Sequence, residues 1–128
     1  MEKKTLQQKL ELLPDEIFQK QILIKKMTEE NQDLKFLMSS MEFNEKESIK
    51  LLCDENGKPM FKSMAAIDRE CKHRLVKDSD YQERKKFFDL EEKKIKTEKL
   101  KLEYLMNQKS CYCALARLGD FESYIKIN

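Results

Sequence analysis

The chain has 128 residues, of which 39% are charged and 40% are hydrophobic, and its net charge at pH 7 is only +2. This composition is too apolar for a disordered chain, too charged for a thick globular core, and too balanced for tight non-specific binding of nucleic acid by a monomer. Two glycines and two prolines leave few helix breakers, so the helices should be long. We therefore predict an all-α fold: a long antiparallel helical hairpin, resembling a coiled coil, with a small irregular or β-hairpin insert.

Residues 1–43 have the pattern of N-terminal helices. Leucines at helical spacing predict a short first helix over residues 3–12. Pro14, followed by two acidic residues, is typical of a helix start and predicts a second helix from there to about residue 41. Residues 44–62 interrupt the helical pattern, and we predict a loop or small hairpin there.

Residues 63–119 should form the C-terminal helices, followed by a tail over 120–128, and we expect the whole chain, 1–128, to be a single helical domain. Ser63 is a suitable N-cap for a helix over 63–77. Asp80, with a glutamate three residues later, resembles a capping box that opens a helix over 80–118. Gly119 is a good residue to end that helix.

An apolar seam recurs every seven residues along the last predicted helix, at Tyr81, Phe88, Ile95 and Leu102. This spacing predicts that the helix packs lengthwise on a partner helix, as in a coiled coil. The N-terminal helix is too short to cover all of it, so we expect a second copy of the chain to cover the rest. A homo-oligomer is therefore predicted.

The candidates for catalytic or metal chemistry are few. Cys111 and Cys113, with Cys53, Cys71 and His73, are the candidate zinc ligands, but residues two apart on a helix point about 200° apart and cannot easily share one metal. No phosphate-binding glycine loop and no nucleophile–base pattern accompanies the single histidine. We predict a protein that is not an enzyme and that has no metal and no cofactor.

Positive charge is concentrated after residue 58: residues 1–57 hold nine Lys/Arg and twelve Asp/Glu, whereas residues 58–118 hold sixteen and ten. Such a basic helix face can follow a nucleic-acid backbone. The alternative is a solvated face, since Asp89 and Lys93 form one of several pairs at favourable i,i+4 spacing. The candidate nucleic-acid-binding residues are Lys72, Arg74, Lys77, Arg84, Lys85, Lys86 and Lys93.

A series of short motifs extends over residues 54–107 of the chain. Its residues are Asp54, Gly57, Lys58, Phe61, Ser63, Arg69, Leu75, Asp78, Tyr81, Glu103, Leu105 and Asn107. In these residues the chain resembles small helical proteins that temperate phages and prophages of low-GC Gram-positive bacteria encode near recombination genes. More distantly, it is similar to the UvsY-type recombination mediators of virulent phages. The pattern covers about half the chain, and it departs at Met64, where the family pattern has Asn, and over 111–117, which lack a basic run.

The resemblance implies a phage-type accessory protein of recombination or replication that acts in the cytoplasm of a bacterial host. It would bind single-stranded DNA without catalysis, through the basic face, and present it to a recombinase. The alternative hypothesis is a helical protein-binding module, either a structural adaptor or a phage-encoded inhibitor of a host defence enzyme. No apolar run is long enough to predict a membrane span, so a membrane partner is not expected.

Overall fold

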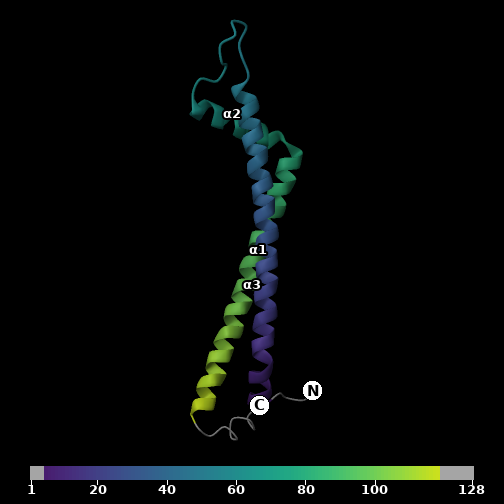
Figure 1. Ribbon diagram of the computed structural model, residues 1–128, viewed down its shortest axis with the longest axis vertical. Coiled ribbons are helices and arrows are strands. Elements are labelled where there is room, and N and C mark those ends of the chain that lie inside the picture. Colours follow the sequence, from purple (N-terminus) through teal and green to yellow (C-terminus); the bar gives the residue numbers. More distant parts are fainter. Residues whose placement is uncertain (1–4, 119–128) are drawn as a thin grey trace. The chain divides into compact units, whose positions relative to one another are not determined.

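The computed structural model describes residues 5–118 and contains three helices in them: α1 (Leu6–Lys50), α2 (Met64–Lys77) and α3 (Ser79–Arg117) (Figure 1). The prediction of an all-α fold is confirmed. The predicted ends at Gly119 and over 120–128 lie outside the described residues.

Helix α1 begins with a capping box that the sequence analysis did not identify. The Thr5 hydroxyl accepts a hydrogen bond from the backbone N–H of Gln8 at 3.2 Å, and the Gln8 side chain accepts one from the Thr5 N–H at 3.0 Å. This reciprocal pair satisfies two of the N–H groups that every helix leaves without an internal partner. It fixes the start of α1 at Leu6, the first buried residue of the apolar stripe.

Pro14 does not start a second helix, as the sequence predicted, but lies inside α1. A proline in a helix interior removes one backbone hydrogen bond and usually costs ~3 kcal/mol or more. Here Leu13 and Ile17, on either side of it, are buried, whereas Pro14 itself is exposed. The packed stripe keeps the helix continuous, and the ring faces solvent.

The predicted irregular segment at 44–62 is also shorter than expected, because α1 continues to Lys50. Ile49 is fully buried there, and Lys46 Nζ forms an ion pair with Asp68 Oδ1 at 3.2 Å. These tertiary contacts stabilise a helical turn that the local sequence does not predict.

The connection between α1 and α2 is a short hook with one isolated bridge, between Cys53 and Pro59, and no strand. The Asp54 carboxylate accepts hydrogen bonds from the backbone N–H groups of Asn56 and Lys58, both at 2.9 Å. Gly57 has a φ of +77°, a conformation that side chains disfavour. The turn predicted from the sequence is therefore present.

Helices α2 and α3 are capped by side chains. The predicted N-cap Ser63 accepts a hydrogen bond from the Ala66 N–H at 3.1 Å, as expected. The predicted capping box at Asp80 is wrong: α3 begins one residue earlier, and Asp78 accepts the hydrogen bond from the Tyr81 N–H at 3.1 Å. One aspartate thus ends α2 and starts α3.

The chain divides into two compact units: unit 1 comprises 1–28 and 93–128, and unit 2 comprises 29–92. Within each unit, α1 and α3 pair in antiparallel orientation. In unit 1, Lys9 lies over the Tyr112 ring and Lys20 bonds Glu98. Residues later in α1 therefore contact residues earlier in α3, as antiparallel helices require.

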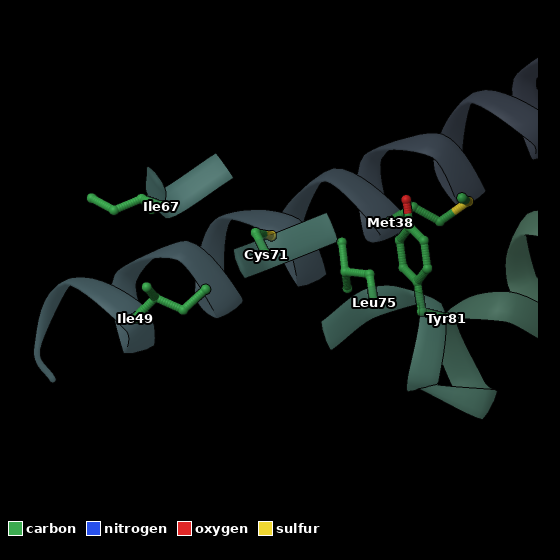
Figure 2. Packing of buried hydrophobic residues seen from close by; sticks show 6 residues of the cluster. All are labelled: Met38, Ile49, Ile67, Cys71, Leu75 and Tyr81. Carbon is green, nitrogen blue, oxygen red and sulfur yellow. The ribbon is translucent and has the colours of Figure 1, made fainter. Parts of the chain in front are cut away.

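Unit 2 holds a hydrophobic cluster built from all three helices (Figure 2). Figure 2 shows Cys71 and Leu75 of α2 between the end of α1 and the start of α3, where Tyr81 lies beside Met38. The predicted seam residue Tyr81 is buried and Phe88 is partly buried against this cluster. Ile95 and Leu102, the other two seam residues, belong to unit 1, where Ile95 is buried and Leu102 is half-buried.

One polar side chain interrupts the apolar stripe of α1 within unit 2. Asn31 is 3% exposed, and its Nδ2 donates hydrogen bonds to Glu92 Oε1 at 2.7 Å and to the Phe88 carbonyl at 3.4 Å. Its Oδ1 is buried without a hydrogen-bond partner. A buried Asn at a coiled-coil seam costs stability but selects one register, because the amide finds its partners only there.

We expect Asn31→Asp to lower the free energy of unfolding by about 2–4 kcal/mol at pH 7, because it places a second carboxylate beside Glu92 and removes a donor. Burial and Glu92 raise the pKa of the introduced carboxyl in the folded state above its unfolded value. The loss should therefore shrink as the pH falls and the group protonates. Urea unfolding at several pH values measures it. A matched Asn31→Leu variant should be neutral or more stable, and an equal loss in both variants would contradict this account.

Candidate binding surfaces

The structure separates the seven predicted nucleic-acid-binding residues into two groups. Arg74 is half-buried, and its guanidinium bonds Glu70 at 3.0 Å and Glu45 at 3.2 Å. Arg84 bonds Asp80 at 3.2 Å. These two arginines have carboxylate partners within the chain, so a phosphate would have to compete for them.

The five predicted lysines are exposed, but they do not lie in one unit. Lys93 belongs to unit 1, and the other four belong to unit 2, on α2 and the start of α3. Unit 2 as a whole carries twelve Lys/Arg and sixteen Asp/Glu, whereas unit 1 carries fourteen and eight. The excess of positive charge over 58–118 therefore does not make unit 2 basic. The exposed lysines are Lys72, Lys77, Lys85, Lys86 and Lys93.

Two of these lysines, Lys72 and Lys85, line a cleft in unit 2 with a volume of about 460 Å³. Lys46 also lines the cleft, and Tyr81 and Cys71 are among the residues that enclose it. Glu42 and Asp68 line it as well, so positive and negative groups alternate around the opening. A cleft of this kind can take an anion, but it already contains two carboxylates that oppose one.

Tyr81 joins α3 to α1 inside this cleft by donating a hydrogen bond from its hydroxyl to the Glu42 carboxylate. Burial, together with this hydrogen bond, raises the pKa of Tyr81 to about 12. The phenol therefore remains protonated and continues to donate throughout the neutral range. The Tyr81–Glu42 bond is a structural tie between the two helices.

Neither the cysteines nor His73 form a metal site within residues 5–118, where no group of three or more possible ligands lies close enough to hold an ion. Cys71 is buried and its thiol contacts the Glu42 carbonyl. Burial raises the pKa of Cys71, which keeps the thiol protonated. Cys53 and Cys111 are exposed on different units.

Unit 1 contains an open apolar groove with a volume of about 810 Å³. Leu23 of α1 forms one wall, and Leu100, Tyr104 and Leu105 of α3 form the other. Leu100 is 66% exposed and Tyr104 is 63% exposed. We call this feature the unit 1 groove. Contiguous exposed apolar surface of this kind is typical of interaction sites.

Polar groups hold the unit 1 groove in shape. Between its walls, Lys20 Nζ bonds Glu98 Oε2 at 2.6 Å, and Lys101 bonds the other oxygen of Glu98 at 3.3 Å. The hydrogen bond from Lys20 is the main reason why the pKa of Glu98 is lowered. The groove is thus a preformed surface that joins α1 and α3.

The heptad seam alone does not predict this groove. Leu100 and Tyr104 lie off the seam of α3, and Leu23 is an exposed apolar residue of the facing helix α1, at positions where a two-helix coiled coil normally has polar residues. Their apolar character was a detectable signal. Apolar residues beside a seam, on both helices, widen the apolar face toward the width that a larger bundle requires.

No protein-family model, curated protein or solved structure matches this chain. The resemblance to phage recombination proteins therefore stays a prediction. Within the described residues, no helix is long and apolar enough to cross a membrane.

Replacing Tyr81 with Phe should lower the free energy of unfolding by about 1–2 kcal/mol at pH 7, because it removes the hydrogen bond to Glu42. The folded-state pKa is above the unfolded value of 10, so the protonated phenol stabilises the fold below pH 10. This stabilisation is lost as the pH rises from 10 toward 12. Urea unfolding of wild type and Tyr81→Phe between pH 7 and 11.5 checks this: the two proteins should converge above pH 10. A constant difference across that range would contradict the assignment, and Tyr104→Phe, at an exposed tyrosine, is the control.

Proposed function

We propose that this protein is a non-catalytic helical binding module, which acts by packing the unit 1 groove against helices of another chain. One observation supports this proposal above all: Leu23, Leu100 and Tyr104 form a joint apolar surface that residues 5–118 leave uncovered. Apolar area removed from water contributes roughly 25 cal/mol per Å², so covering such a groove is favourable.

The groove also has the anatomy of a protein interface. Its lining combines aliphatic and aromatic side chains with charged groups, including Asp15, Glu16 and Lys101. Tyr104 receives a hydrogen bond from Gln108 at 3.0 Å, which orients its ring at little further entropic cost. A rigid aromatic residue surrounded by a polar rim is typical of the residues that dominate binding energy.

Site-specific crosslinking tests this proposal. A photoreactive phenylalanine analogue replaces Tyr104 in the full chain, which is then irradiated in living bacteria and, after purification, alone. We expect discrete adducts larger than the chain, because Tyr104 should lie within the interface. The same analogue at Glu103, which is exposed and next in sequence, is the matched control. Absence of adducts from position 104, or equal adducts from both positions, would overturn the proposal.

A second candidate function is the binding of single-stranded DNA, as a phage-type recombination accessory. It is favoured by Lys72, Lys77, Lys85 and Lys86, which are exposed on adjacent helices of one unit. The neighbouring carboxylates and the net negative charge of unit 2 oppose it. The geometry therefore supports protein binding better.

If DNA binding occurs through these four lysines, the affinity for a fluorescent single-stranded oligonucleotide should fall roughly fiftyfold between 50 and 200 mM salt, as expected for four phosphate contacts. Lys85→Glu with Lys86→Glu should reduce both the affinity and the salt dependence, measured by fluorescence anisotropy. Lys35→Glu, at an exposed lysine of α1 in the same unit, should change neither by more than about twofold. Binding that is insensitive to salt, or that the control weakens equally, would contradict this mode.

A further inference from the structure

The two walls of the unit 1 groove carry opposite charges at the same level. Antiparallel pairing and the Lys20–Glu98 bond set a common level for the two helices. Glu16 lies four residues before Lys20, about 6 Å along α1, and Lys101 lies three residues after Glu98, about 4.5 Å along α3. Because the helices run in opposite directions, both displacements point the same way, and Glu16 and Lys101 lie level across the groove.

This arrangement is self-complementary. A two-fold rotation about an axis parallel to the helices and above the groove places α1 of one copy over α3 of the other, in antiparallel orientation. The rotation does not change the level of any residue along the axis. Glu16 of each copy then lies near Lys101 of the other copy, and the exposed apolar residues of each groove, Leu23, Leu100 and Tyr104, are covered by the helices of the other copy.

We propose that the occupant of the unit 1 groove is a second copy of this chain, which forms a four-helix bundle of this two-fold symmetry. The inference deepens the proposed function and rests on it. All four neighbouring helix pairs of such a bundle are antiparallel, the arrangement of up-and-down bundles. A closed two-fold interface uses the same patch on both copies, as the matched charges of the groove require.

A charge-exchange experiment tests the pairing. Glu16→Lys leaves lysines at both 16 and 101, and Lys101→Glu leaves glutamates at both positions. In a homodimer each single variant replaces two attractive contacts by two repulsive ones, so self-association should weaken about tenfold. An equimolar mixture of the two variants should restore dimerisation to within about threefold of wild type, as heterodimers, because every contact between different chains is again attractive.

The mixture separates contacts between copies from contacts within one chain. Each variant chain retains its own like-charge pair after mixing, so a rescue cannot come from a contact within the chain. Sedimentation equilibrium measures the dimer constant against the 15.4 kDa chain mass, with circular dichroism to verify that each variant is helical. Glu103→Lys and Lys25→Glu, at exposed positions outside the groove, are the matched controls and should dimerise like wild type.

A chain carrying both Glu16→Lys and Lys101→Glu provides a second readout, since its homodimer again has opposite charges in contact and should form about as tightly as wild type. Three results would overturn the inference: a monomeric wild type at 200 µM, single variants that dimerise like wild type, or a mixture no tighter than the single variants. Crosslinks from position 104 only to chains of other mass would also overturn it while leaving the proposed binding function in place. Absence of any crosslink would overturn both.

Discussion

The antiparallel pairing of α1 and α3 is the constraint on which the other features depend. A pair of helices can bury only the stripe that each presents to the other, and this stripe includes Leu13, Ile17 and Ile24 on α1 and Ile95 on α3. In unit 2 the third helix supplies more cover, because α2 adds Ile67, Cys71 and Leu75 to the cluster. In unit 1 the described residues provide no third helix. The apolar residues beside the stripe therefore remain in water there.

The polar contacts between the paired helices select the register, and so they determine which residues form the groove. Asn31 can donate to Glu92 and Phe88 in only one alignment, and Lys20 reaches Glu98 in only one. A shift of one helical turn would separate the two walls of the unit 1 groove and would place Glu16 and Lys101 at different levels. The Lys20–Glu98 contact thus sets the alignment of the two helices in unit 1. The costly buried amide of Asn31 restricts the helix pair of unit 2 to one alignment.

The helical fold could be predicted from the sequence because long periodic stripes are local signals, and the Ser63 cap could be predicted for the same reason. The helix boundaries that were wrong depend on tertiary contacts. Pro14 stays helical because buried neighbours on either side hold the helix, and residues 44–50 stay helical because Ile49 is buried. Helix packing also determines which basic residues form ion pairs, since Glu45 of α1 reaches Arg74 of α2 only after the two helices pack together. No local pattern in the sequence reports which carboxylate will lie opposite an arginine.

The same reasoning separates the two hypotheses about function. Phosphate binding needs cations that remain available after folding. The folded chain pairs two of the seven predicted residues with carboxylates, and two others, Lys72 and Lys85, line a cleft that two carboxylates also line. Packing against another helix needs apolar area that folding does not consume, and unit 1 keeps such area on both walls of one groove. Burial of apolar surface is the main source of stability in association. Covering the apolar walls of the unit 1 groove would therefore stabilise a complex. The proposed second copy would supply this cover, and the level positions of Glu16 and Lys101 on opposite walls would pair their charges across a two-fold axis.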